Sequence, residues 1–256
     1  MQKIIMNLML LVFIAMLSGC ATDAKLQAQI DQVNRLNYHK SYDNQGDANW
    51  AVGQWVLYRT STGSHEEIFR LFDKEPIPGF RKITITGKTG SSFWLEQQIV
   101  GPKQEETIAA LVDVAASQEK SHFNIVRIKF TQSDGKIVEI DKKNIADNQA
   151  ENAWEEMQYL INLFEHSHKH GRIRTISTPA GTFNNAYEIP FAMSRVLGQE
   201  KGNVFYSHAV PILTLVKLQA TDTTSRWFKN TSTWEIADFG HVGGSSHFSF
   251  QGQSRL

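Results

Sequence analysis

The stretch "FRKITITGKTGSSFWLEQQIV", residues 80–100, is the part of the chain that most clearly indicates the fold. Ile83 and Ile85 alternate with polar neighbours, and this period of two is typical of a strand with one buried face. Gly87 and Gly90 bracket a turn, after which "FWLEQQIV" supplies a return strand. We therefore predict a β-hairpin, and the neighbouring sequence repeats its rhythm.

Short runs with turn signals between them lie on both sides of this hairpin. "GQWVLYRT", residues 53–60, predicts a strand before it. "HFNIVRIKF", residues 122–130, predicts a strand in which Val126, Ile128 and Phe130 are buried and the alternate basic residues face water. "SDG" then turns into "KIVEI", which completes a second hairpin. The pattern of "TIAALVDVAA", residues 107–116, fits a strand or a helix equally well.

One segment departs from the β pattern. "DNQAENAWEEMQYLINLFEHSHKHG", residues 147–171, carries an apolar stripe at helical spacing: Ala150, Ala153, Trp154, Met157, Leu160, Ile161 and Phe164. Asp147 or Asn148 can cap its start, and Gly171 is a natural stop. We predict a helix of about five turns that packs against the core.

Strands resume after this helix. The segments are "GRIRTIST" (171–178), "TPAGTFNNAYEIP" (178–190), "GNVFYSHAVPILTLVKLQAT" (202–221, broken at Pro211), "TSTWEIADFG" (231–240) and "SSHFSF" (245–250). About ten strands around one long helix predict a mainly β (α+β) fold, a single antiparallel sheet that curls around the helix. No linker rich in Pro, Gly or Ser follows Gly53, so we expect one domain over residues 53–256.

The N-terminus has the order of a secretory signal peptide. Lys3 precedes an apolar run from residue 4 to residue 17, which is shorter than the roughly 20 residues that a membrane span needs. The run ends in "LSGC", residues 17–20, which resembles the lipobox of bacterial lipoproteins. That resemblance implies cleavage after Gly19, diacylglyceryl modification of Cys20 and acylation of the new N-terminus.

Cys20 is the only cysteine of the chain, so an internal disulfide is excluded. Ala21 stands where Asp would resemble an inner-membrane retention signal, which favours the outer membrane, with the domain facing the periplasm. We expect residues 1–19 to be the signal peptide. We expect residues 20–52 to be the lipidated N-terminus, with an amphipathic helix near residues 24–37 and a polar linker.

Several C-terminal motifs are similar to those of one known group. "TPAGTF", "AYEI", "GNVFYSHAVPILTLVKL" and "WEIADFG" resemble bacterial envelope proteins related to the lipoprotein-localisation carriers of the LolA/LolB type. The turn at residues 178–183 and the Val210-Pro211 segment match, whereas Thr214 stands where that group has glycine. The resemblance implies an open half-barrel sheet with helices in its mouth, and an acyl chain or other apolar ligand.

Composition excludes several classes of function. The chain has 26 basic and 26 acidic residues and no basic stripe, so nucleic acid is not an expected partner. No arrangement of nucleophile, base and oxyanion donor is apparent, so we expect no enzyme activity and no cofactor. His166 and His170 have the spacing of two ligands on one helix face, but a zinc site needs three or four. They stay weak metal candidates beside the simpler interpretation of a basic helix end.

The residues predicted to line or close an apolar ligand pocket are large and come from the helix and the strands. They are Trp154, Met157, Leu160 and Phe164 of the helix and Trp55, Trp94 and Phe130 of the strands. Ordinary core packing is the alternative for each of them. At the level of the protein, the alternative is a structural or interaction lipoprotein of the outer membrane that has no ligand and contacts other envelope proteins.

Overall fold

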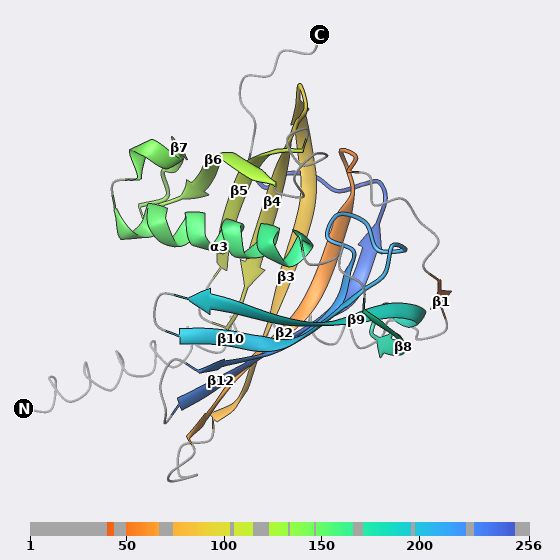
Figure 1. Ribbon diagram of the computed structural model, residues 1–256. Coiled ribbons are helices and arrows are strands. Elements are labelled where there is room, and N and C mark those ends of the chain that lie inside the picture. The colour runs from red at the N-terminus through yellow and green to blue at the C-terminus, as the bar shows by residue number, and fades with distance from the viewer. Residues whose placement is uncertain are drawn as a thin grey trace, which may run out of the picture.

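Over the residues that it describes, the computed structural model contains twelve strands and one long helix (Figure 1). It describes residues 40–43, 50–66, 74–102, 105–114, 123–132, 134–145, 147–165, 171–195, 198–223 and 228–248. The strands are β1 (Ser41–Tyr42), β2 (Trp55–Glu66), β3 (Lys74–Thr89), β4 (Ser92–Val100), β5 (Glu105–Asp113), β6 (Asn124–Thr131), β7 (Ile137–Asp141), β8 (Arg172–Thr178), β9 (Gly181–Arg195), β10 (Gly198–Tyr206), β11 (Leu215–Thr223) and β12 (Phe228–Gly240). The helix is α3 (Asn148–Glu165), and a short 3₁₀ helix spans Lys142–Asn144.

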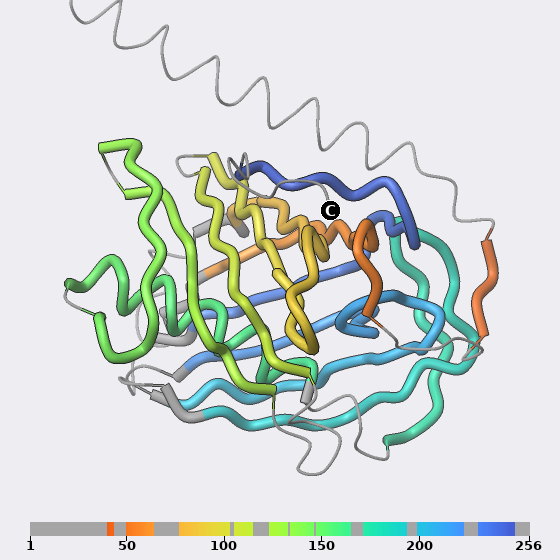
Figure 2. The backbone as a smooth tube through the Cα atoms, turned by 90° about the horizontal axis from the view of Figure 1, so that it is seen from above, coloured from red at the N-terminus to blue at the C-terminus, as the bar shows by residue number. Residues whose placement is uncertain are grey.

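All of these strands belong to one sheet, in the order β1-β9-β10-β11-β12-β2-β3-β4-β5-β6-β7, with β8 also paired to β9. The pairs are antiparallel except for the short parallel contact between β1 and β9. The two ends of this order do not pair with each other, so the sheet stays open, and Figure 2 shows its strong twist. The predicted mainly β class and the predicted hairpin of β3 and β4 are confirmed.

The strand count is twelve rather than the predicted number of about ten. Residues 107–113 of the ambiguous segment prove to belong to strand β5, and β1 is too short to leave a sequence pattern. One predicted strand is missing in part. Residues 245–248 form no strand, so the prediction of a final strand at residues 245–250 is wrong over these four residues. They run instead across a face of the sheet.

The core lies on one face of the sheet, called the inner face below, which α3 covers. Along β2 and β3 the alternation holds, because Val56, Tyr58, Ile83 and Ile85 are all 0% exposed and belong to this core. Burial raises the pKa of the phenols of Tyr58 and Tyr206, so both remain hydroxyl donors at neutral pH. The Tyr58 hydroxyl donates to the carbonyl oxygen of Leu215 at 2.9 Å.

Helix α3 forms where the sequence predicts it. The Oδ1 atom of Asp147 accepts a hydrogen bond from the backbone N–H of Ala150 at 2.8 Å, which is the arrangement of an N-cap. The predicted apolar stripe is buried without exception, and α3 contacts β5 and β6. The helix therefore contributes its stripe to the same core as the strands.

One burial prediction for β6 is wrong. Val126 is 36% exposed, whereas its neighbour Ile125 is 5% exposed and lies in the core. The cause is a register shift. Leu111 of β5 pairs with Arg127 but Val112 pairs with Ile125, so Val126 has no partner opposite and the alternation changes phase. Ile128 and Phe130, beyond the shift, are buried as predicted.

The segment after β12 crosses the other, outer face of the sheet. The carboxylate of Glu96, only 2% exposed, accepts hydrogen bonds from the Ser246 hydroxyl at 2.5 Å and the His247 backbone N–H at 2.7 Å. Phe248 then packs beside Trp94 in a small separate cluster. Residues 241–248, called the strap below, therefore cover apolar surface that β4 and β5 present on the outer face.

Candidate functional site

A pocket of about 720 Å³ lies at the end of the inner face that α3 leaves uncovered. It is lined by residues of β2, β3, β4, β10, β11, β12 and α3, together with Gly101 and Pro102. Its volume falls within the range of roughly 300–1,000 Å³ that is typical of small-molecule sites. It is therefore the candidate binding site.

The pocket exists because the inner face changes from apolar to polar along several neighbouring strands. On β2, the buried Tyr58 is followed on the same face by Thr60 and Thr62. On β12, Trp234 is preceded on that face by Ser232 and Asn230. Helix α3 buries its apolar stripe against the apolar part of the face, so the short polar side chains are left as the floor of the pocket.

A charged group separates this floor from α3. The guanidinium of Arg81 forms an ion pair with Glu156 of α3, and Gln97 donates a hydrogen bond from Nε2 to the same carboxylate at 3.1 Å. The Cζ atom of Arg81 lies 4.4 Å from the ring centre of Trp234, a distance at which a cation–π attraction operates. Arg81 is thus held between a carboxylate and an aromatic face.

A second polar link joins α3 to the opposite wall. The hydroxyl of Tyr159 donates to Oε1 of Glu200 on β10 at 3.2 Å, and Glu200 is only 2% exposed. The rings of Tyr159 and Trp234 meet edge to face at 6.0 Å. Glu200 pairs across the ladder with Asp222 of β11, which also lines the pocket. This wall is therefore rich in hydrogen-bonding groups.

Apart from Arg81, the wall formed by β3, β4 and the residues after β4 is apolar. Ile77 is 53% exposed, which is unusual for a large aliphatic side chain, and Ile99, Val100 and Pro102 lie beside the same space. One wall of hydrocarbon and one of hydroxyl, amide and carboxylate groups suit a ligand that has both an apolar and a polar part. Among the described residues that line the pocket there is no histidine, cysteine or lysine.

The residues predicted to line an apolar pocket do not all come together. Five of them lie in the inner-face core and are 0–7% exposed: Phe130, Trp154, Met157, Leu160 and Phe164. Trp94 is buried against the strap on the outer face. Trp55 donates from its indole nitrogen to the carbonyl oxygen of Val242 at 3.2 Å, again toward the strap. None of the seven residues lines the 720 Å³ pocket.

None of the lining residues was predicted, and those with the most pronounced polar or aromatic character are Arg81, Tyr159, Glu200 and Trp234. Their strands and helix were predicted, but burial of a charged or polar group depends on partners far away in sequence. One signal was available in "TSTWEI", where a period of two places Ser232 and Trp234 on one face. Such a mixed face marks the boundary between a covered and an open part of a sheet.

Other predicted sites lie outside the described residues, namely Cys20, the amphipathic segment near residues 24–37, and both His166 and His170. In the described part of the chain, no group of three or more His, Cys, Asp or Glu side chains is placed to hold a metal ion. No helix within that part is long and apolar enough to cross a membrane.

Comparison with protein-family models finds no family that matches this chain, and comparison with curated proteins finds no significantly similar sequence. Proposals about function therefore depend on the chain's own residues.

Proposed function

We propose that this chain is a lipid-anchored protein of the bacterial cell envelope whose β-rich domain binds an amphipathic ligand without transforming it. The observation that carries the proposal is the 720 Å³ pocket, with an apolar wall on β3 and β4 and a hydrogen-bonding wall on β10 to β12. Pockets of this size with a few convergent polar groups are the usual place for a small ligand.

The N-terminal sequence supports the anchor. A basic residue, an apolar run and Leu17-Ser18-Gly19-Cys20 follow in the order that a lipoprotein signal requires. A diacylglyceryl group and an additional acyl chain on Cys20 supply the more than one hydrocarbon chain that stable anchoring needs. Ala21 favours the outer membrane, with the domain in the periplasm.

The half-barrel interpretation of the fold belongs to this proposal. An open antiparallel sheet with one helix across its inner face agrees with the resemblance to the LolA/LolB-type carriers (Figure 1). The pocket lies beside the helix and not beneath it, because the space between α3 and the sheet is filled by side chains. The polar part of the ligand therefore meets the wall formed by Tyr159, Glu200 and Asp222.

That filled core also favours the second candidate function, a structural or interaction lipoprotein with no ligand. The large residues expected to enclose a ligand are packed against one another instead. The two candidates differ in one measurable respect, which is whether the purified protein retains a small molecule.

The test uses the mature chain from residue 20, with C20S, exported behind a cleavable signal peptide. Native mass spectrometry followed by organic extraction measures any retained molecule. We expect a defined amphipathic compound at near one copy per chain, and its loss in S232W, which fills the pocket. T233W is the matched control, because its side chain lies on the opposite face of β12. A clean apo mass that persists after incubation with envelope lipids would favour the interaction lipoprotein.

The anchor is tested separately on the full chain. Intact mass spectrometry of protein extracted from membranes should show an N-terminus at Cys20 that carries diacylglyceryl and acyl groups. The C20S variant should lack both the cleavage after Gly19 and the added mass. An unmodified thiol at Cys20 would exclude the anchor while leaving the pocket open to test.

A further inference from the structure

The connection between β10 and β11, residues 207–214, has the most unusual backbone in the described chain. Ile212 has a φ of 66° and Thr214 a φ of 55°, so two β-branched residues adopt the left-handed region that favours glycine. Such conformations are costly and persist only where the surroundings hold them in place. They cluster at active sites, ligand clamps and switch regions.

This connection, called the plug below, is also buried. Val210, Ile212 and Leu213 are 0% exposed and Thr214 is 1% exposed, and the first three belong to the inner-face core. Connections normally run over the surface, where water satisfies their backbone groups. Here an apolar sequence, Val210-Pro211-Ile212-Leu213, packs into the inner-face core, and Figure 1 shows the connection folding back close to the end of α3.

The plug is fastened at its base and by one tryptophan. At the base, the backbone N–H of Ser207 donates to the carbonyl oxygen of Thr214 at 2.8 Å. Within the plug, the carbonyl oxygen of Ile212 accepts a hydrogen bond from the indole nitrogen of Trp50 at 3.1 Å. The Trp50 ring stacks on Phe123 at 5.4 Å and lies 5.8 Å from Phe164 of α3. The backbone strain at Ile212 and Thr214 is thus offset by burial and by the hydrogen bond from Trp50 to Ile212, called the clasp below.

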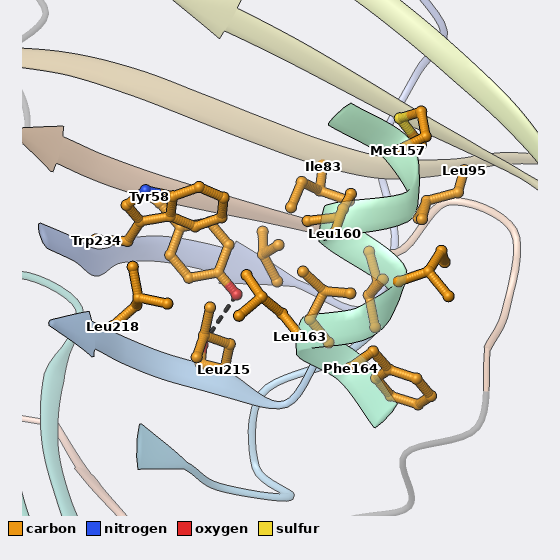
Figure 3. Packing of buried hydrophobic residues seen from close by; sticks show 14 of the residues in the cluster. Tyr58, Ile83, Leu95, Met157, Leu160, Leu163, Phe164, Leu215, Leu218 and Trp234 are labelled. Atoms are coloured by element: carbon orange, nitrogen blue, oxygen red, sulfur yellow. Dashed lines mark hydrogen bonds between the residues drawn. The ribbon is translucent and has the colours of Figure 1, made fainter. Parts of the chain in front are cut away.

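An apolar path links the plug to the pocket. Tyr58 donates its hydroxyl to Leu215, the first residue after the plug, and its ring centre lies 5.9 Å from that of Trp234. Figure 3 shows Tyr58 lying between Trp234 and Leu215. Trp234 lines the pocket. A row of packed side chains therefore connects the plug to the candidate binding site.

We propose that the plug occupies the binding position of the ligand's hydrocarbon part and moves away when the ligand binds. When a hydrocarbon chain enters from the pocket, it takes the place of Val210 to Leu213, and the clasp of Trp50 on Ile212 opens. The exchange trades one buried apolar group for another, and it releases the backbone strain at Ile212 and Thr214. This inference rests on the proposed function, because it concerns how that same site accommodates an apolar chain.

The first test isolates the strain with T214G and T214A. Both variants remove the same side-chain atoms beyond Cβ, but glycine adopts a positive φ without strain whereas alanine does not. In the mature chain with C20S, we expect amide hydrogen exchange at residues 208–213 to be about three- to tenfold slower in T214G than in T214A. Affinity for the uncharged apolar fluorophore N-phenyl-1-naphthylamine should fall in T214G by the same factor.

The second test opens the clasp. W50F keeps an aromatic ring for stacking but removes the indole donor to Ile212. We expect faster exchange at residues 208–213 and tighter binding of the same fluorophore, each by about three- to tenfold. W55F is the matched control, since it removes an indole hydrogen bond to Val242 on the outer face and should change neither quantity.

The two variant pairs change the plug in opposite directions, so general loss of stability cannot imitate both results. The proposal that the plug moves would be wrong if T214G and T214A showed equal amide exchange and equal affinity for the fluorophore, and W50F and W55F did so as well. If S232W nevertheless abolishes binding of the fluorophore, the pocket stands and only the plug is excluded. If S232W has no effect and no molecule is retained, the proposed function fails together with the plug.

Discussion

Single side chains fasten distant strands of this sheet to each other. The buried Tyr58 hydroxyl on β2 and the Leu215 carbonyl on β11 are 157 positions apart in sequence, and they are joined by a hydrogen bond. A buried polar group without a hydrogen bond loses its hydration free energy and gains nothing in return. The pair therefore matters chiefly because it avoids this cost, since the net free energy of the hydrogen bond itself is small.

We expect Y58F to lower the free energy of unfolding by about 1–2 kcal/mol, because it leaves a buried carbonyl unpaired. Urea titration followed by tryptophan fluorescence measures this change. Y42F is the matched control, because the Tyr42 hydroxyl is 3.4 Å from its acceptor, the carbonyl oxygen of Ala180, and is only part-buried. A loss in Y42F as large as that in Y58F would show that burial of the carbonyl is not the cause.

The outer face carries a charge cluster across three neighbouring strands. Glu235 accepts hydrogen bonds from Lys217 at 2.7 Å and from Arg59 at 2.8 Å. Burial by itself raises the pKa of Glu235, but the hydrogen bonds and charges of these two cations outweigh it, so the net pKa lies below its ordinary value of 4.5. A carboxyl group with a lowered pKa in the folded state stabilises the protein above its unfolded pKa.

That stabilisation should disappear as the pH falls through the lowered pKa of Glu235. We therefore expect E235Q to unfold at lower urea than the parent at pH 7, by roughly 1 kcal/mol, and the difference to shrink below pH 4. E139Q, which alters a more exposed ion pair on β7, should show a smaller difference at pH 7. A gap between E235Q and the parent that does not change with pH would contradict the assignment.

At the scale of elements, α3 is the only α-helix among the described residues, and it covers a large part of the inner face. Leu160 is 0% exposed, and Figure 3 shows it pointing from α3 toward Ile83 of the sheet. We expect L160A to reduce the free energy of unfolding by about 2–5 kcal/mol, because it removes buried area and leaves a cavity.

The control for L160A is E155A on the exposed side of α3, which should change stability by less than about 0.5 kcal/mol. Urea titration with circular dichroism measures both variants. If L160A were as mild as E155A, the helix would be docked loosely, and the interpretation of the inner face as a packed core would be wrong.

At the scale of the whole molecule, the pairing of β12 with β2 joins neighbouring strands that lie farther apart in sequence than any other pair of the described sheet. It joins Trp55–Glu66 to Phe228–Gly240, so a strand made early in synthesis is paired with a strand made late. The strap then returns over β4 and β5 and shields Trp94. Both features tie the C-terminal segment to the first hairpins.

Because Phe248 is 3% exposed in the strap, F248A should lower the free energy of unfolding by about 2 kcal/mol and shift the fluorescence of the buried Trp94 to longer wavelength. H247A is the matched control, since its side chain is exposed and only its backbone N–H contacts Glu96. Equal behaviour of F248A and H247A would mean that the strap does not seal this face.

The sequence by itself determined the mainly β class, the hairpin of β3 and β4, the start of α3 with its buried stripe, and the break at Pro211. Each of these depends on local periodicity, capping or turn chemistry, which neighbouring residues specify. It also determined the expected anchor at Cys20, which stays a prediction. Local patterns suffice here because backbone geometry repeats every two or every 3.6 residues.

Only the tertiary structure decided where the pocket lies. The phase change at Val126, the strap over Trp94, the strained plug and the group formed by Arg81, Glu156 and Trp234 all depend on strands that are far apart in sequence. A large apolar residue looks the same in sequence whether it fills a core or encloses a ligand. Which of the two it does is set by the side chains that reach it from other strands, and those contacts form only when the sheet is complete.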